Sequence, residues 1–289
     1  MLNEACPICG SSTAFVGSRG GSRSNRVYNV RRCHACGYGY IENPWSDFDK
    51  IYDENYYNGL GSDPLIDYAF EFENPELSVR GYEWDAWQEL VHHKFPQKLK
   101  WLDVGCGCGS LVRHVQNRNY DNVFGYDTGT WALKAKKVGV SILNDKELIN
   151  HEGTFDVITA IDVIEHIADP CAALRGWRKL LKKGGRLFVV TQNAHCAPTQ
   201  FVQWSYIEPE IHVSFFTPEA LTLAYKKSGF GAQAFPKTNA WHKILRARIL
   251  KNLKIKQKNR IEATMPWWLL SRLADWKLKM SAMPLGIAE

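Results

Sequence analysis

Three glycines at alternating positions follow a short apolar stretch near the middle of the chain. Residues 101–109 read Trp-Leu-Asp-Val-Gly-Cys-Gly-Cys-Gly, and a segment with an apolar stripe begins directly after them. This order predicts a buried strand, a tight loop and then a helix. Because glycine has no Cβ, the backbone of such a loop can pass close beneath a ligand. The spacing differs from the Gly-x-Gly-x-x-Gly of dinucleotide-binding loops, which argues against NAD dependence.

Two acidic residues extend the predicted ligand site beyond the loop. A second strand-like run, residues 123–126, ends in Asp127, where a carboxylate can accept both hydroxyls of a ribose. Asp103 lies two residues before the first glycine. From there its side chain can bond the loop and face a cationic group.

Strand and helix patterns alternate from residue 100 onward. Such alternation requires a mostly parallel sheet covered by helices on both faces, which is an α/β fold. Ligands of these sheets bind beyond the carboxyl ends of the strands. Residues 284–289 are expected to begin a last strand. The other predicted strands are 100–104, 122–126, 140–143, 155–160, 185–191 and 231–235, and the predicted helices are 75–94, 109–119, 129–137, 169–182 and 217–228.

The pattern Asp-x-Gly-x-Gly-x-Gly followed by a strand-end acid resembles the class I methyltransferases that bind S-adenosylmethionine (SAM). Residues 155–170 resemble the segment after the fourth strand in ubiquinone-pathway O-methyltransferases, and residues 210–219 resemble a second, histidine-bearing segment of that group. The resemblance covers about residues 95–236 and implies a Rossmann-like sheet that binds SAM. It does not identify a substrate. The SAM-binding residues that we predict are Asp103, Gly105, Cys106, Gly107, Gly109, Asp127, Asp145 and Ile161.

Two histidines and a glutamate are the candidate catalytic residues. Methyl transfer to a hydroxyl requires alignment of the acceptor with the sulfonium and removal of the acceptor's proton. Histidine is the side chain best matched to that proton near neutral pH. We therefore predict His212 and His166 as candidate bases, with Glu165 beside them. His212 is preferred, because its loop is expected to lie opposite the glycine turn.

Alternatively, the same residues could bind a divalent metal ion. Asp162, Glu165 and His166 occupy positions i, i+3 and i+4, so one helical turn would place them on one face. In relatives that include small-RNA 2′-O-methyltransferases, a similar Glu-x-x-Glu-His and a later histidine bind an ion that acidifies the acceptor hydroxyl. This resemblance implies a second metal site that adds His212. Asp162 is one methylene shorter than the first Glu of that pattern. Alternatively, Glu165 and His166 orient the pocket without metal.

Two Cys-x-x-Cys-Gly knuckles near the N-terminus predict a zinc ribbon. Four thiolates in tetrahedral array select zinc, and four protein ligands leave no open position for catalysis. Residues 26–32 and 37–41 are predicted to form a pair of strands. His34 lies within the second knuckle and is expected to be exposed, and a single redox dithiol would not explain two knuckles. The predicted structural zinc ligands are Cys6, Cys9, Cys33 and Cys36.

The chain is expected to contain three regions. These are a zinc ribbon at 1–43, a linker with N-terminal helices at 44–94, and a methyltransferase domain at 95–289. Tyrosine-rich residues 52–57 resemble segments that follow the ribbon in methyltransferases of sugar and surface-polysaccharide pathways, which implies contact with the SAM or acceptor pocket. Simple packing on the core is the alternative. No apolar run approaches the roughly 20 residues that span a bilayer, and no signal peptide is evident. A cytoplasmic location is therefore expected.

The positive charge is concentrated in a basic helical insertion at about 237–280. The chain has a net charge of +6, and residues 241–280 carry eleven Lys or Arg against two acids. Such a segment can cover the core or the acceptor pocket, lie on an anionic membrane surface or bind a lipid-linked acceptor, or follow the phosphates of a nucleic acid. Its two apolar stripes are Leu245, Ile249 and Leu253, and Leu269, Leu273, Trp276 and Met280.

Together these features predict a SAM-dependent methyltransferase that acts on a small molecule. The acceptor is expected to be a hydroxyl of a sugar or sugar-linked metabolite, on the resemblance to ribbon-bearing methyltransferases. RNA methylation is one alternative, in which the ribbon and the basic segment would hold phosphates. A SAM-binding scaffold without catalysis is the other.

Overall fold

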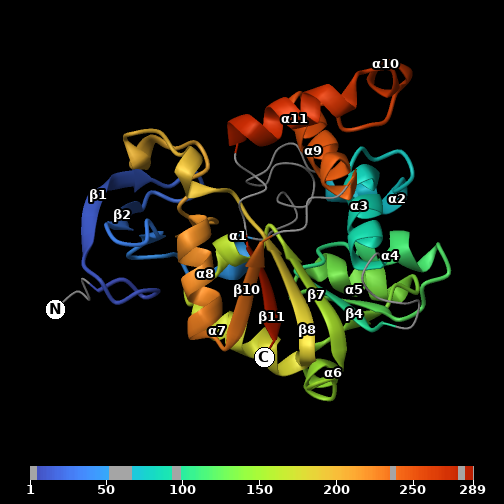
Figure 1. Ribbon diagram of the computed structural model, residues 1–289, viewed down its shortest axis with the longest axis horizontal. Helices are drawn as coiled ribbons and strands as arrows, with labels where there is room; N and C mark the ends of the chain where they lie inside the picture. The colour runs from blue at the N-terminus through green and yellow to red at the C-terminus, as the bar shows by residue number, and fades with distance from the viewer. Residues whose placement is uncertain (1–4, 52–66, 93–98, 235–238, 279–283, 289) are drawn as a thin grey trace. The chain divides into compact units, whose positions relative to one another are not determined.

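A computed structural model describes residues 5–51, 67–92, 99–234, 239–278 and 284–288 (Figure 1). The chain divides into two compact units. The first, called the ribbon unit below, comprises Met1–Ile51, Ile158–Phe235 and Ala282–Glu289. The second, the glycine-loop unit, comprises Tyr52–Val157 and Pro236–Ser281. The tyrosine-rich residues 52–57 lie outside the described residues.

The larger sheet has seven strands and confirms the predicted Rossmann-like α/β class. Its strand order is β10-β11-β8-β7-β4-β5-β6. Neighbours β4, β5 and β6 run parallel, whereas β11 pairs antiparallel with both β8 and β10. The predicted final strand therefore exists and completes an antiparallel hairpin. The strands are β4 (Trp101–Val104), β5 (Val123–Tyr126), β6 (Ile142–Leu143), β7 (Phe155–Ile161), β8 (Leu181–Val190), β10 (Phe230–Ala234) and β11 (Pro284–Ala288).

In the glycine-loop unit, β4 is buried along its whole length, as expected for a strand covered on both faces. The helix predicted over 75–94 begins later, at Gly81, and it buries Trp84 and Trp87. Leu77 precedes that helix and is exposed. Helix α9 packs on α3, and α11 packs on α9 (Figure 1). The helices are α2 (Tyr68–Glu73), α3 (Gly81–His92), α4 (Ser110–Gln116), α5 (Thr130–Lys137), α6 (Asp145–Ile149), α9 (Asn239–Asn252), α10 (Arg260–Ala263) and α11 (Trp267–Leu278).

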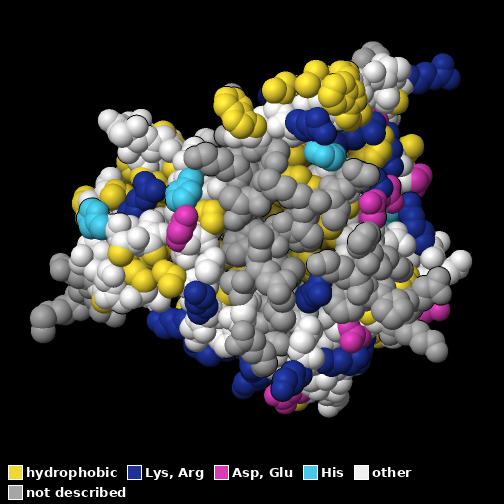
Figure 2. Space-filling view, in the orientation of Figure 1, with side chains coloured by type: hydrophobic (Ala, Val, Ile, Leu, Met, Phe, Trp, Pro, Cys, Tyr) yellow, Lys and Arg dark blue, Asp and Glu magenta, His cyan; other side chains and the backbone are white. Residues whose placement is uncertain are grey.

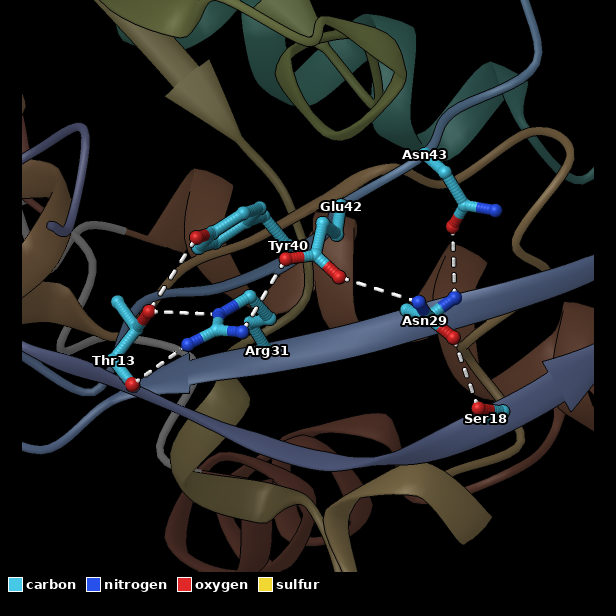
Figure 3. Close-up of polar contacts among 7 residues, drawn as sticks. All are labelled: Thr13, Ser18, Asn29, Arg31, Tyr40, Glu42 and Asn43. Atoms are coloured by element: carbon cyan, nitrogen blue, oxygen red, sulfur yellow. Dashed lines mark hydrogen bonds and ion pairs between the residues drawn. The ribbon is translucent and has the colours of Figure 1, made fainter. Parts of the chain in front are cut away.

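In the ribbon unit, the two predicted strands pair antiparallel and lie within a smaller sheet. Its order is β1-β2-β3-β9, with β1 (Thr13–Gly20), β2 (Val27–Cys33), β3 (Gly39–Ile41) and β9 (Ser214–Phe215). The first of these strands was not predicted from the sequence. Across this sheet, Arg31 donates to the Thr13 hydroxyl at 2.9 Å and to Glu42 at 3.3 Å (Figure 3). Asn29 donates to the same carboxylate at 3.2 Å. The negative charge of Glu42 is therefore compensated within the ribbon.

Helices α7 (Pro170–Leu180) and α8 (Pro218–Lys227) also belong to the ribbon unit, together with the short α1 (Phe48–Ile51). Helix α8, predicted over 217–228, begins with a capping threonine followed by proline. The Thr217 hydroxyl accepts the Ala220 amide at 3.1 Å, which satisfies one of the free N–H groups of the first turn. Among the described residues, no helix combines the length and apolar character that crossing a bilayer requires.

Candidate active site

Positive φ angles shape the loop that follows β4. Gly105, Gly107 and Gly109 have φ of 68°, 55° and 70°, which side-chain-bearing residues rarely adopt. Space is limited as well, because a Cβ on Gly109 would lie 3.0 Å from Val140 Cγ1. The Gly105 amide donates to the Tyr126 carbonyl at 2.8 Å, which ties the loop to the end of β5. The loop is therefore a compact cradle formed by backbone.

Asp127 follows β5 and closes the cradle. Its two carboxylate oxygens accept the amides of Gly107 at 2.9 Å and Gly129 at 2.7 Å. Burial raises the pKa of Asp127, and the two amide bonds only partly oppose this shift. Because each carboxylate oxygen has two lone pairs, both retain capacity to accept a ribose hydroxyl. The cradle and this acid therefore fit the adenosine part of SAM.

The other residues predicted to bind SAM differ in how far they are buried. Asp103 is buried within β4. Burial raises the pKa of the Cys106 thiol well above its usual value, so this side chain is a neutral packing residue. Asp145 is exposed at the start of α6 and accepts the Tyr126 hydroxyl at 2.6 Å. Ile161 is half-buried at the end of β7 and belongs to the ribbon unit.

Aromatic residues beside the loop were missed by the sequence analysis. Cys108 and Trp131 form a small buried cluster, against which Tyr68 and Phe72 of α2 pack. The Tyr68 ring also approaches the loop, since a Cβ on Gly107 would lie 3.2 Å from its Cε1. The available signal for Trp131 was its place in the first turn of the helix after Asp127. Nothing comparable marked Tyr68.

The candidate catalytic residues lie in the ribbon unit. After β7, only a single 3₁₀ turn forms, η2 (Ile164–His166). Asp162 precedes this turn with φ 53°. The prediction that one helical turn would hold Asp162, Glu165 and His166 is therefore wrong, because a positive φ takes Asp162 out of the helical path.

Both predicted histidines are held by backbone carbonyls. His166 Nδ1 lies 3.1 Å from the Ile211 oxygen, and His212 Nδ1 lies 2.8 Å from the Tyr206 oxygen. A carbonyl only accepts, so Nδ1 of His212 carries the proton and its Nε2 is the basic nitrogen, whereas the His166 ring also hydrogen-bonds the Asp162 backbone. The rings meet edge to face with centroids 5.0 Å apart. Burial, and then the charge of His212, lower the pKa of His166 to about 3, which keeps that ring neutral near pH 7.

Glu165 is fully buried beside these rings. The Tyr206 hydroxyl donates to its Oε1 at 2.5 Å, and the Tyr206 ring stacks on His212 at 4.3 Å. Burial, and then the charge of Asp162, raise the pKa of Glu165 to about 8. Among the described residues, its Oε2 has no hydrogen-bond partner. Such an atom marks a place for a proton or a ligand. Tyr206 was not predicted, because nothing in the sequence distinguishes it from a core tyrosine.

These side chains also offer a set of metal ligands. One ligand atom each from Glu165, His166 and His212 lies within 4.8 Å of the others. Two imidazoles and a carboxylate suit a divalent transition metal. The unpartnered Glu165 oxygen is consistent with such an ion, whereas Asp162 is not a member of this group.

The four predicted zinc ligands converge. Sγ of Cys6 lies 3.7 Å from Sγ of Cys36, and Sγ of Cys9 lies 3.4 Å from Sγ of Cys33. A tetrahedron with Zn–S bonds of 2.3 Å has edges of about 3.8 Å, so the cluster fits zinc. His34 is exposed, as predicted.

The two apolar stripes of the basic segment lie in different environments. Leu245 of α9 is buried, although Leu253 beyond the helix end is exposed. On α11, Trp268 and Trp276 are 65% and 81% exposed. Figure 2 shows hydrophobic side chains gathered over this helix, with basic side chains beside them. Met280 lies outside the described residues.

A family profile described as a methyltransferase domain matches residues 78–233, which is more than half of the chain. A ubiquinone biosynthesis O-methyltransferase of Colwellia psychrerythraea is 36% identical over 102 residues, covering 32% of this chain and 41% of the relative. The enzyme of the same name from Pseudomonas aeruginosa is 31% identical over 152 residues, covering 44% and 64%. The chain thus spans less than two thirds of the length of these relatives.

Solved structures resemble the chain in fold. A phosphoethanolamine N-methyltransferase 2 from Haemonchus contortus, in complex with phosphomonomethylethanolamine and S-adenosylhomocysteine, superposes with a TM-score of 0.52. The match covers 84% of this chain and 61% of that chain at 18% identity. At this identity the likeness concerns the fold alone.

Proposed function

This chain belongs to the class I SAM-dependent methyltransferases, and we propose that it methylates a hydroxyl of a small acceptor with His212 as the base. The observation that carries the base assignment is the bond from His212 Nδ1 to the Tyr206 carbonyl at 2.8 Å. It fixes the tautomer in which Nε2 can take a proton. His166, with its pKa lowered to about 3 chiefly by burial, serves as a neutral neighbour.

SAM supplies an activated methyl group on a sulfonium. In our proposal the loop glycines and Asp127 hold its adenosine, with Asp103 and Asp145 of the same unit beside them, and Ile161 of the ribbon unit stays a candidate from the sequence. Glu165 and Tyr206 fix the pocket beside the histidines. Because SAM is already activated, the protein has to align the acceptor and remove its proton.

The acceptor is proposed at two levels. The O-methyltransferase relatives support a hydroxyl. A sugar or sugar-linked metabolite rests on the resemblance of the four-cysteine ribbon and the tyrosine-rich segment to methyltransferases of sugar pathways. The test is incubation with methyl-labelled SAM and host extract separated into small metabolites, glycolipids and RNA. Label in the metabolite or glycolipid fraction would support the proposal, and label in RNA would replace it with RNA methylation.

Replacement of His212 tests the base directly. His212→Gln should lower kcat by about 10²- to 10⁴-fold, the usual contribution of a general base, while the Kd for SAM stays within twofold. His195→Gln is the matched control, since His195 is a half-exposed histidine of the same unit whose contact with Glu219, at 3.1 Å, lies outside the cluster. Unchanged turnover in His212→Gln would contradict the assignment. A protein that binds SAM but labels no acceptor in any fraction would favour the scaffold alternative.

A divalent ion on Glu165, His166 and His212 is a second proposal for the same cluster, supported by the unpartnered Glu165 oxygen. Such an ion would acidify the acceptor hydroxyl as a Lewis acid. Electron paramagnetic resonance can measure Mn²⁺ binding while the ribbon keeps its zinc. Mn²⁺ binding should be lost in Glu165→Gln and kept in Glu152→Gln, a control at an exposed site. Equal binding by both variants, or none by the wild type, would leave the metal-free base as the mechanism.

We also propose that α11 contacts an anionic membrane surface, where a lipid-linked acceptor would be held. Trp268, Leu269, Leu273 and Trp276 are exposed on this helix, within a segment of local charge +9. Sedimentation with phosphatidylglycerol vesicles, but not with phosphatidylcholine vesicles, is expected. The double variant Trp268→Ser/Trp276→Ser should abolish it, and Leu133→Ser/Ile149→Ser, at sites 58% and 74% exposed in the same unit, should not. Binding of single-stranded RNA without vesicle binding, or a dimer dissociated by the tryptophan variant, would contradict the proposal.

A further inference from the structure

The segment that carries His212 has little regular structure of its own. Between the 3₁₀ turn η4 (Phe201–Gln203) and β9, it consists of turns and irregular backbone. Two local bonds hold the histidine, from its amide to the Glu208 carbonyl at 2.7 Å and from Nδ1 to the Tyr206 carbonyl at 2.8 Å. The orientation of this imidazole therefore depends on whatever fixes residues 204–216.

The zinc ribbon fixes that segment on the N-terminal side of His212. The Glu210 carboxylate is buried, and its Oε2 accepts the amides of Ser22 at 2.9 Å and Arg23 at 2.7 Å. Gly21, the residue before them, leaves room for this carboxylate, because a Cβ there would displace Glu210 Oε1. From β1, Arg19 donates to the Trp204 carbonyl at 2.7 Å. The hairpin between β1 and β2 thus binds residues 204–210.

The ribbon also fixes the segment on the C-terminal side. Strand β3 pairs with β9, and the Ile41 amide donates to the Val213 carbonyl at 3.0 Å. The Tyr38 hydroxyl lies 2.8 Å from the Ser214 hydroxyl, and both side chains are buried. The Ser214 hydroxyl in turn donates to the Ile167 carbonyl at 2.6 Å. His212 is therefore bracketed by two anchors that belong to the ribbon, at Glu210 and at Ser214.

The second anchor begins at a zinc ligand. The Cys36 carbonyl accepts the Thr217 hydroxyl at 2.7 Å, and Tyr38 and β3 follow within three residues of Cys36. A zinc ion held by the four cysteines would join Cys33 and Cys36 to the first knuckle and would thereby fix the point at which β3 starts. In such small sites the free energy of metal binding is largely free energy of folding. Strand β2, in the hairpin that carries the first anchor, ends at Cys33, so loss of zinc is expected to loosen the backbone on which both anchors depend.

We propose that the zinc ribbon is a positioning element for His212, so that zinc occupancy fixes the orientation of this imidazole through Glu210, Tyr38 and Ser214. The inference rests on the proposed base role of His212 only for its effect on turnover. A displaced catalytic group lowers kcat steeply, by up to about 10²-fold for a shift of 1 Å. SAM affinity belongs to the loop after β4 and is not expected to change.

The first test follows the histidine Cε1–H resonances with and without zinc, removed by a strong chelator. The resonances of His212 and His114 are assigned from His212→Gln and His114→Gln. We expect the His212 resonance to shift or broaden on zinc removal. The control is His114, which contacts Asp85 at 2.8 Å in the glycine-loop unit, and its resonance should not move. An unmoved His212 resonance, or equal changes at both histidines, would overturn local positioning.

A second test leaves the zinc in place. Glu210→Gln keeps the shape of the side chain but weakens the bonds to Ser22 and Arg23. It should move the His212 resonance and lower kcat by about 10- to 100-fold, with one zinc per chain and a Kd for SAM within twofold. The matched control is Glu42→Gln, because Glu42 pairs with Arg31 and Asn29 inside the ribbon (Figure 3). If Glu210→Gln leaves the resonance in place, the proposal fails. If the resonance moves and turnover does not, the base role of His212 fails instead.

Discussion

A single carboxylate unites two loops in the glycine-loop unit. Asp127 binds the Gly107 amide in the loop after β4 and the Gly129 amide in the loop after β5. It therefore shapes the cradle before any ligand arrives, which lowers the entropy cost of binding. The same burial that makes this arrangement rigid raises the pKa of the carboxyl group.

This shift predicts an unusual pH dependence of SAM affinity. A carboxyl group with a raised pKa becomes protonated at a higher pH than an ordinary aspartate, and the protonated form accepts ribose hydroxyls less well. The Kd for SAM should therefore rise as the pH falls from neutral into the acid range. Asp127→Asn should bind about 10- to 100-fold more weakly at pH 7, from the loss of charge-assisted bonds, with a Kd that changes little over this range. Isothermal titration calorimetry measures both, and a wild-type Kd independent of pH would contradict the assignment.

At the scale of elements, the sequence predicted what local patterns encode. The glycine loop, the cysteine knuckles and the start of α8 at Thr217 each depend on residues close together in the chain, and each was found. The helix over 75–94 was placed too early, because its apolar pattern extends to Leu77, which is exposed before the first turn. Tyr206 could not be predicted, since its role comes from a contact with Glu165, 41 positions away.

Two helix caps of the ribbon unit allow a test of whether the bond between Thr217 and the Cys36 carbonyl adds stability. Asp169 caps α7 by accepting the Ala172 amide at 2.9 Å and is exposed. Thr217 caps α8, and its buried hydroxyl also donates to the Cys36 carbonyl at 2.7 Å. Asp169→Ala should cost about 1 kcal/mol, the usual loss of a cap. Thr217→Ala should cost about 1–3 kcal/mol more, because it leaves a buried carbonyl unpaired.

Thermal unfolding followed by circular dichroism at saturating zinc compares the two variants. A larger loss of Tm in Thr217→Ala than in Asp169→Ala is expected. Equal losses would mean that the bond to the zinc knuckle adds nothing beyond the helix cap.

At the scale of the whole molecule, chain order and compact units do not coincide. The predicted regions at 1–43, 44–94 and 95–289 are continuous in sequence, and they remain a prediction about domains. The compact units instead join Met1–Ile51 with Ile158–Phe235, and Tyr52–Val157 with Pro236–Ser281. Such long-range grouping comes from strand pairing, as between β3 and β9, which no local sequence pattern encodes.

We therefore expect S-adenosylhomocysteine and zinc to change hydrogen exchange in different units. A ligand that binds only the folded state stabilises it by RT ln(1 + [L]/Kd), about 2.7 kcal/mol at 100 times Kd. S-adenosylhomocysteine, the demethylated form of the cofactor, should slow hydrogen exchange mainly in residues 101–132, which include the loop and Asp127. Zinc removal should speed exchange mainly in 5–41 and 204–217, where the ribbon and its anchors lie. Exchange measured by mass spectrometry separates these segments. Faster exchange throughout 101–132 on zinc removal would contradict this separation, because the metal would then stabilise both units together.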